Sequence, residues 1–196
     1  MNIRAPSCSS AIEEIRKWAE HNQLDFYHDV LTGMGAVYSS CRRYRLLIWR
    51  IWSPHNQFLS FGMLNPSTAG HDSTDPTATR CTKRGMNMRQ WDVGGWLGWN
   101  LFAFRATHPK VMKRHIDPVG RHNDAAIRLA VRLSRQHIAG WGTDGGFECR
   151  DLHVCRMLAV DGVELHCLGL TKHGFPRHPL YVPFSMDPMV WEYDYD

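Results

Sequence analysis

Polar and ionisable residues of the types that bind ligands follow four apolar segments of this chain. They carry amides, hydroxyls, carboxylates, cations and aromatic rings. In chain order they are Asn65, Ser67, Asp72 and Asp75; Asn100 and Arg105; Trp141 and Thr143; and Thr171, Lys172, His173, Arg177, His178 and Tyr181. Ligands of open parallel sheets bind beyond the carboxyl ends of the strands. If the apolar segments are parallel strands, these side chains gather at one edge of the sheet and form a binding site.

Asn100 differs from the other polar residues because it lies within an apolar segment, WLGWNLFAF (96–104). A buried amide without partners costs about 1–3 kcal/mol, so this side chain needs hydrogen bonds. Two interpretations remain open. Either the backbone supplies the partners and the residue is structural, or the amide faces a ligand that offers both a donor and an acceptor, as a nucleobase edge does.

Hydrophobic periodicity and turn residues predict the elements that position these side chains. Strands are expected at 44–52, 57–64, 96–104, 137–142 and 164–170, with the turn-like SPHN joining the first two into a hairpin. Helices are expected at 10–21, from 75 to about 90, from 117 to about 135 and over 147–160. Asp75-Pro76 and Asp117-Pro118 each have the Asp cap and first-turn Pro typical of a helix start.

Strands that alternate with helices favour parallel pairing through right-handed crossovers. The predicted fold class is therefore α/β, a three-layer α/β/α sandwich with a four-stranded parallel core sheet, plus an N-terminal helix and the hairpin. Residues 1–40 are expected to form an N-terminal helical extension packed on the core. Residues 41–196 are expected to form a single α/β domain.

Composition limits the class of protein. Hydrophobic residues make up 43% of the 196 residues and charged residues 21%, which excludes a disordered or fibrous chain. No apolar run approaches the ~18 residues of a membrane span and no signal peptide is evident, so a cytoplasmic protein without a membrane partner is expected. The net charge of +4 suits an anionic partner such as DNA or a nucleotide, although it is mild.

Cysteine and histidine spacing gives little sign of a metal site. The six cysteines contain no CxxC pair, so reduced thiols in the core are expected. Cys149 and His153 are four residues apart on a predicted helix, with His166 and Cys167 in the following strand. Because this spacing matches no common zinc pattern, we expect no metal ligands and no cofactor.

Three short motifs resemble those of the uracil-DNA glycosylase superfamily, in the same order along the chain. FGMLNPSTAG (61–70) is similar to its first motif, and RHPLY (177–181) supplies the His-Pro of its second. Between them, WNLFAFRATHP (99–109) is similar to a strand of the thermostable branch, with Asn100 at the position of the base-recognition Asn. The resemblance implies a four-stranded parallel α/β/α core and a base-binding pocket.

A closer resemblance covers about residues 40–185. MLNPSTA, NLFAFRAT, DPVG and LGLTKHGFPRHPLY together resemble a family of small bacterial and phage proteins designated domain of unknown function 1643 (DUF1643). This resemblance indicates family membership and implies no activity.

The glycosylase resemblance implies a role for each matching residue. Asn65 would position the attacking water, Asn100 would recognise the base edge and His178 would donate a hydrogen bond to the departing base. Ser67 would contact the substrate, and Leu180 or Tyr181 would fill the space left by a flipped nucleotide. Contacts to phosphates would come from Arg105, Lys172 and Arg177.

The motifs also depart from the superfamily. Many of its enzymes carry an Asp or Glu in the first motif to activate water, and Asn65 stands in that position here. Asp72 or Asp75 would then supply the carboxylate, although Asp75 is equally suited to cap a helix. The second motif has Leu180 where Ser is usual, and the iron-sulfur cysteines of the thermostable branch are missing.

Three functions are consistent with these residues. The first is a glycosylase-like hydrolase of the N-glycosidic bond of a damaged or modified base in DNA or a nucleotide, a DNA repair or modification activity. The second is a non-catalytic binder of modified bases or nucleic acid that uses the same pocket. The third is a transferase or hydrolase that acts on a nucleotide-like metabolite.

Overall fold

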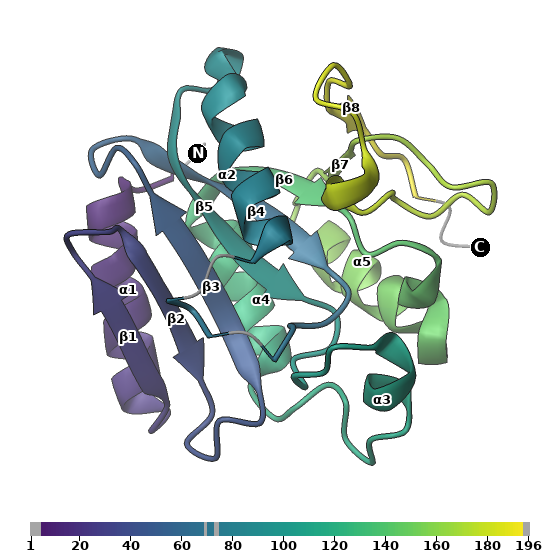
Figure 1. Cartoon of the computed structure of the whole chain (residues 1–196), viewed down its shortest axis with the longest axis horizontal. Helices are drawn as coiled ribbons and strands as arrows, with labels where there is room; N and C mark the ends of the chain where they lie inside the picture. Colours follow the sequence, from purple (N-terminus) through teal and green to yellow (C-terminus); the bar gives the residue numbers. More distant parts are fainter. Residues whose placement is uncertain (1–4, 69, 73–74, 194–196) are drawn as a thin grey trace.

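The protein is built on one eight-stranded sheet. The computed structural model describes residues 5–68, 70–72 and 75–193. The strands lie in the order β1-β2-β3-β5-β4-β6-β7-β8 (Figure 1). Their bounds are β1 Asp25–Asp29, β2 Met34–Tyr38, β3 Arg45–Ile51, β4 Gln57–Met63, β5 Val93–Asn100, β6 Ser134–Ala139, β7 His166–Cys167 and β8 Met189–Val190.

The sheet is mixed, so the predicted α/β class is confirmed but the sheet is wider and less parallel than expected. β4 pairs in parallel with β5 and β6, and β6 pairs in parallel with the two-residue β7. Antiparallel strands continue the sheet on both sides, β3, β2 and β1 beyond β5 and β8 beyond β7. Most of the pairings are therefore antiparallel, and the predicted four-stranded parallel core is not the whole framework.

The predicted hairpin of 44–63 does not form, because β5 lies between β3 and β4. Ile48 of β3 faces Gly98 of β5, and Leu59 of β4 faces Trp96 of β5. A Cβ at Gly95 would lie 2.8 Å from the Arg50 carbonyl oxygen, so glycine permits the close approach of β5 to β3. The chain does turn at Ser53–Asn56, but the two strands that this turn connects, β3 and β4, lie on either side of β5 and do not pair with each other.

The N-terminal segment contributes strands as well as a helix. α1 (Cys8–His21) begins after Ser7, whose hydroxyl accepts a hydrogen bond from the Ser10 amide at 3.3 Å, so the helix starts slightly earlier than predicted. β1 and β2 were not predicted, and they extend the sheet from β3. The domain division at residue 40 stays a prediction.

Of the two Asp-Pro pairs that were predicted to start helices, only one lies directly at a helix start. α2 (Pro76–Asn87) begins directly after Asp75, as predicted. α4 (Asn123–Arg132) begins after Asp117-Pro118 by several residues, because the Asp117 carboxylate accepts the Gly120 amide at 2.9 Å and closes a turn instead. The remaining helical segments are η1 (Arg89–Trp91), α3 (Pro109–Lys113), η2 (Thr143–Cys149), α5 (Arg150–Val160) and η3 (Pro179–Tyr181).

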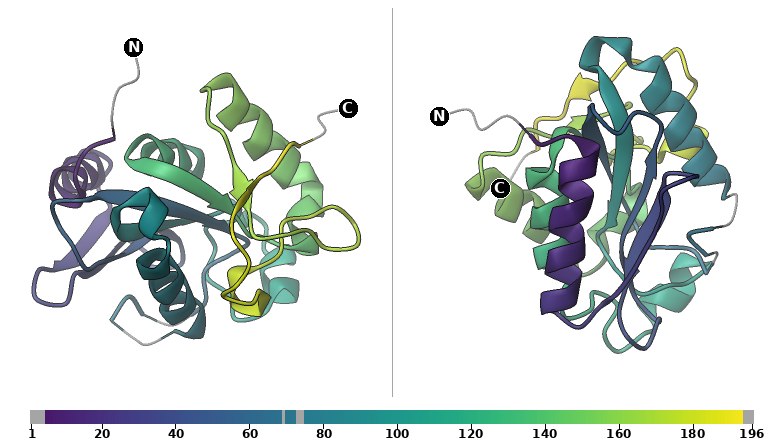
Figure 2. Two further views of the ribbon diagram at one scale, coloured as in Figure 1. Left: turned by 90° about the horizontal axis from the view of Figure 1, so that it is seen from above. Right: turned by 90° about the vertical axis from the view of Figure 1, so that its left-hand side faces the viewer.

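Helices cover both faces of the sheet. α1, α4 and α5 lie on one face, which we call the back, and α2 lies on the other, the front (Figure 2). The larger apolar core fills the back and includes Leu47, Trp99 and Phe102. A smaller cluster under α2 includes Ile48, Phe61 and Trp96. None of the helices in the described ranges is long and apolar enough to span a bilayer.

Candidate functional site

A cavity of about 580 Å³ opens on the front of the sheet, among α2, η3 and the loops that follow β4, β5 and β6. Its volume lies within the range of small-molecule sites. Seven of the ten predicted site residues line it, namely Asn65, Ser67, Asn100, Arg177, His178, Leu180 and Tyr181. Asp72, Arg105 and Lys172 are not among the residues that line it.

The parallel pairing of β4 and β5 brings Asn65 and Asn100 to the same edge of the sheet. Met63 of β4 pairs with Asn100, the last residue of β5, and Asn65 follows two residues later. The loops after the two strands are then joined: the Ala106 amide donates to the Pro66 carbonyl at 2.9 Å, and Asn65 Nδ2 donates to the Ala106 carbonyl at 2.8 Å. The amide nitrogen of Asn65 therefore holds the two loops together.

Arg105 reinforces the same joint and does not line the cavity. Its guanidinium donates to the backbone carbonyls of Arg42 and Thr68 and stacks over the Tyr38 ring at 5.2 Å. These contacts give it a structural position between β2 and the two loops. These contacts within the protein do not support the predicted role of Arg105 in phosphate binding, which stays a proposal.

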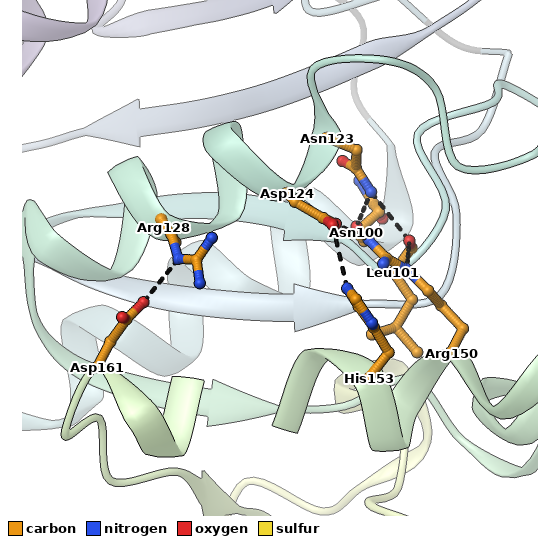
Figure 3. A network of polar contacts seen from close by, with 8 residues as sticks. All are labelled: Asn100, Leu101, Asn123, Asp124, Arg128, Arg150, His153 and Asp161. Carbon is orange, nitrogen blue, oxygen red and sulfur yellow. Dashed lines mark hydrogen bonds and ion pairs between the residues drawn. The ribbon is translucent and has the colours of Figure 1, made fainter. Parts of the chain in front are cut away.

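Asn100 is held from the back of the sheet. Its side chain is 2% exposed. Asn123 Nδ2 donates to the carbonyls of Asn100 and Leu101 at 3.0 and 2.9 Å, and Arg150 Nε donates to the Leu101 carbonyl at 2.9 Å (Figure 3). Asp124 accepts hydrogen bonds from Arg150 and His153 (Figure 3). This network fixes the backbone at the end of β5, where Asn100 lines the cavity.

The Asn100 amide nitrogen has no hydrogen-bond partner among the described residues. Buried amides are normally paired, and an unpaired one costs about 1–3 kcal/mol. The first of the two sequence interpretations, an amide satisfied by the backbone, therefore does not describe Nδ2. A ligand acceptor in the cavity would satisfy it.

The contacts of His178 determine which of its ring nitrogens can donate a hydrogen bond when the ring is neutral. Its Nδ1 accepts the Leu180 amide at 3.3 Å, which places the proton of the neutral ring on Nε2. Burial lowers the pKa of His178, although the charge of Asp75 opposes the shift. A Cβ at Gly140 would lie 2.7 Å from Cδ of Pro179, so glycine at the end of β6 allows η3 to pack closely there.

Asp75 lines the cavity where Asp72 does not. One carboxylate oxygen of Asp75 accepts the amides of Thr77 and Ala78 at 2.7 and 3.1 Å, which confirms the predicted helix cap. The other accepts the Ser67 hydroxyl at 3.2 Å. Asp72 is exposed on the loop before α2. Of the two residues predicted to supply a water-activating carboxylate, only Asp75, which caps α2, therefore lines the cavity.

The loop between β4 and α2 is anchored by the N-terminal strands. The His71 ring stacks on Tyr27 with centroids 4.9 Å apart, and its Nδ1 lies 3.4 Å from the Tyr38 hydroxyl. Arg50 donates to the His71 carbonyl at 2.7 Å. The unpredicted strands β1 and β2 thus hold the loop that carries Ser67 and leads to Asp75.

Several lining residues were not predicted as site residues, and Arg45 is the most informative of them. It begins β3 and is 7% exposed. Burial lowers the pKa of Arg45 to about 10, with Tyr38 and Asp75 favouring the charged form. A charged residue inside the apolar run RLLIWRI was the available signal. Trp141, which the sequence placed among the residues that could bind a ligand, lines the cavity and is 2% exposed.

The rim of the cavity carries exposed residues. Arg177 donates to the Tyr181 carbonyl at 3.3 Å, and Tyr181, which is 72% exposed, lies with its ring 5.7 Å from that of His178. Lys172 is exposed on the loop after β7. A cation and an aromatic ring therefore stand at the entrance, with Leu180 between Tyr181 and His178 in the chain.

The cysteine and histidine pairs do not form a metal site in the described part of the chain, where no three His, Cys, Asp or Glu side chains gather around a common point. His153 is paired with Asp124 at 3.1 Å. Four of the six cysteines are buried, as expected of core thiols, whereas Cys41 and Cys149 are exposed.

Comparison with known proteins identifies the family. The sequence model of the family described as "Protein of unknown function (DUF1643)" matches residues 43–180. The chain therefore belongs to this family, and the match contains every lining residue named above except Tyr181. No curated protein and no solved structure matches the chain.

Proposed function

We propose that this member of the DUF1643 family recognises a nucleobase in the front cavity and hydrolyses its N-glycosidic bond, in DNA or in a nucleotide. The observation that carries the proposal is the buried Asn100 amide, whose nitrogen lacks a protein partner and whose residue lines a cavity together with the neutral His178. The glycosylase-like fold implied by the motifs is part of the same proposal.

Asn100 suits an aromatic base with mixed donors and acceptors. Its Nδ2 donates to a ring carbonyl and its Oδ1 accepts a ring N–H, so the side chain distinguishes bases by both atoms. The apolar residues Ile48, Met63 and Trp96 line the same cavity and suit the faces of a ring. The network of Asn123 and Arg150 behind the strand keeps the recognition residue in one position.

His178 would stabilise the leaving base. Hydrolysis breaks the bond between the sugar C1′ and the base nitrogen, and the electron pair leaves on the base. The Nε2–H of a neutral His178 donates a hydrogen bond to an oxygen of that anion, which gains negative charge in the transition state. A preorganised donor of this kind contributes ~3–4 kcal/mol. Because the Leu180 amide occupies Nδ1, the donor stays on the other nitrogen.

Asp75 would activate the water. The water oxygen bonds to C1′, and the proton that it releases passes to the carboxylate oxygen that now accepts only the Ser67 hydroxyl. The departed base takes a proton from solvent, which balances the reaction. Asn65 Oδ1 orients the same water, since its Nδ2 is already engaged with the loop after β5. Arg177, Lys172 and Tyr181 at the rim would contact the DNA backbone and the flipped nucleotide.

Base release tests the proposal. Single- and double-stranded oligonucleotides that carry uracil, hypoxanthine or modified pyrimidines are incubated with the protein, and abasic sites are cleaved with alkali. We expect release of at least one base. The His178→Ala variant should retain its fold and lose about 10²–10³-fold in rate. An unchanged rate in this variant would remove His178 from the mechanism.

Two isosteric variants test the water-activating group. Asp75→Asn keeps the helix cap, because Asn caps as well as Asp, and it removes the base, so we expect about a 10²-fold slower release with unchanged stability. Asp72→Asn is the matched control, because it removes a carboxylate from the same loop outside the cavity lining, and its rate should equal that of the wild type. Equal rates for both variants would show that Asp75 is not the base.

A second candidate is base binding without hydrolysis. It is favoured by the commitment of the Asn65 amide nitrogen to the backbone and by the three donors that already engage Asp75. Binding that weakens with salt and with the Arg177→Ala variant, and that yields no product, would identify this function.

A further inference from the structure

A second groove, of about 370 Å³, lies between α2 and the segment that contains η3. We call it the α2 groove. Leu180 lines both this groove and the front cavity, so the two adjoin at that residue. The other lining residues come from α2 and from the chain after η3; they are Pro76, Thr79, Arg80, Lys83 and Phe184. A ligand that fills the front cavity and continues past Leu180 therefore enters the α2 groove.

Two arginines of α2 fix the outer wall of the α2 groove. Arg84 is 2% exposed and donates to three backbone carbonyls of residues 182–186 at distances from 2.8 to 3.0 Å. Arg80 donates to the Val182 carbonyl, and its Cζ lies 3.8 Å from the centroid of the Phe184 ring. These contacts hold Phe184 in place beside Arg80, so the wall is a built part of the fold.

The α2 groove has an excess of positive charge. Arg80 and Lys83 line it, and Arg177 stands at the neighbouring rim of the front cavity. None of the three forms an ion pair within the described ranges. Burial lowers the pKa of Arg84, and the nearby charge of Arg80 lowers it further, while Asp187 opposes the shift. The groove therefore suits an anionic ligand.

Exposed aromatic rings stand among these cations. Phe184 is 41% exposed in the α2 groove, and Tyr181 is 72% exposed at the rim of the front cavity. Unpaired bases stack on aromatic rings and on guanidinium planes, while the phosphates between them contact cations. A duplex keeps its bases paired, and an acidic peptide would leave the rings unused. The combination of rings and cations therefore favours a single strand.

We propose that the α2 groove binds the nucleotides next to the target base, so that the substrate of the front cavity is single-stranded DNA. The inference rests on the proposed function, because it names the substrate class of the same site. One neighbouring base stacks on the flat pair formed by Arg80 and Phe184, and a phosphate contacts Lys83. The target base itself passes Leu180 into the front cavity.

Fluorescence anisotropy with three labelled probes tests this assignment. The probes are a thymine oligonucleotide of about 12 nucleotides, within the site sizes of single-strand binding proteins, its duplex with the complementary strand, and a glutamate peptide of the same length. We expect the single strand to bind about 10-fold more tightly than either of the other probes, because it alone offers both free bases and phosphates. Its affinity should fall as the salt concentration rises.

Three variants assign the binding to the α2 groove. Lys83→Ala removes one phosphate contact, so it should weaken binding of the single strand about 3- to 10-fold and lower the slope of log Kd against log salt concentration by about 1. Phe184→Ala removes a stacking surface and should weaken binding about 5- to 100-fold. Lys17→Ala is the matched control, because it removes the same charge from an exposed position of α1 on the back, and it should bind as the wild type does.

Circular dichroism establishes that each variant is folded. If Phe184→Ala is not, the salt slopes of Lys83→Ala and Lys17→Ala give the result, because both lysines are exposed.

The outcomes distinguish this inference from the proposed function. A duplex or glutamate peptide that binds as tightly as the single strand, equal effects of Lys83→Ala and Lys17→Ala, or no binding of the single strand would each overturn the α2 groove as its site. Base release from a free nucleotide at the same rate in Lys83→Ala and the wild type would still support the hydrolase. Conversely, single-strand binding that depends on Lys83 and Phe184 without base release would support the groove and contradict the hydrolase.

Discussion

The two faces of the sheet are filled in different ways. On the back, α1, α4 and α5 cover a continuous apolar core, and the few polar side chains there hold the backbone or one another. On the front, α2 and the loops cover a smaller apolar cluster and leave a cavity of about 580 Å³. The back is therefore a packed core, whereas the front keeps open space beside the Asn100 amide nitrogen, which has no partner among the described residues.

Substitutions at two neighbouring residues of β3 should give the largest difference in the free energy of unfolding. Leu47 points into the back core and Ile48 lines the cavity. Leu47→Ala should lower the free energy of unfolding by about 3–4 kcal/mol, because it opens a hole in a packed core. Ile48→Ala should cost about 1–2 kcal/mol, because part of its surface already lacks packing partners. Urea unfolding measures both, and equal losses would contradict the proposed difference between the faces.

A partly buried histidine on the back, His137, predicts acid sensitivity. His137 Nδ1 lies 3.0 Å from the Ser60 hydroxyl, and burial lowers the pKa of His137 to about 4. The unfolded chain, with a pKa near 6.5, therefore binds the proton more readily, so stability is full above pH 6.5 and falls as the pH drops toward 4. The loss from this residue is about 2–3 kcal/mol.

His137→Asn isolates this contribution, because Asn keeps an acceptor near the position of Nδ1. The free energy of unfolding of the wild type should fall more steeply between pH 6.5 and 4 than that of the variant. His71, His122 and His178, whose pKa values are also lowered by burial, contribute equally to both proteins. Parallel curves would show that His137 is not the acid-sensitive group.

Removal of the hydrogen bonds by which Asn123 holds the end of β5 from the back of the sheet should have the smallest effect on stability. Asn123→Ala removes the donors to the Asn100 and Leu101 carbonyls, so we expect a loss of about 1–3 kcal/mol and weaker ligand binding in the front cavity. Arg128→Ala on the same helix breaks only the exposed pair with Asp161 and should change either quantity little (Figure 3). If Asn123→Ala left binding unchanged, the back network would not position the front site.

The part of the site that could be predicted from the sequence lies at the ends of the strands. Asn65, Asn100 and His178 follow or end apolar segments, and parallel pairing brings the first two to one edge whatever the rest of the fold does. Asp72 and Arg105 belong to the same loops but do not line the cavity, because the side chains of adjacent loop residues point in different directions. The roles of the seven lining residues stay predictions.

The rest of the fold depends on pairings between distant segments. The turn at Ser53–Asn56 is a local signal for a hairpin, and it gives no sign that β5 inserts between β3 and β4. β1 is a short, polar segment, DFYHD, without the alternation of a half-buried strand. Arg45 was missed for a related reason: a cation in an apolar strand is a signal for burial, but the cavity that Arg45 lines is built by distant segments.

The central claim is that a nucleobase binds in the front cavity between Asn100 and His178. A crystal structure of the protein soaked with uracil, or with whichever base the release assay identifies, tests it most directly. We expect density for the base with one of its carbonyl oxygens within hydrogen-bond distance of Asn100 Nδ2 and another facing His178 Nε2. An empty cavity at saturating concentration of that base, or a base bound elsewhere on the molecule, would contradict it.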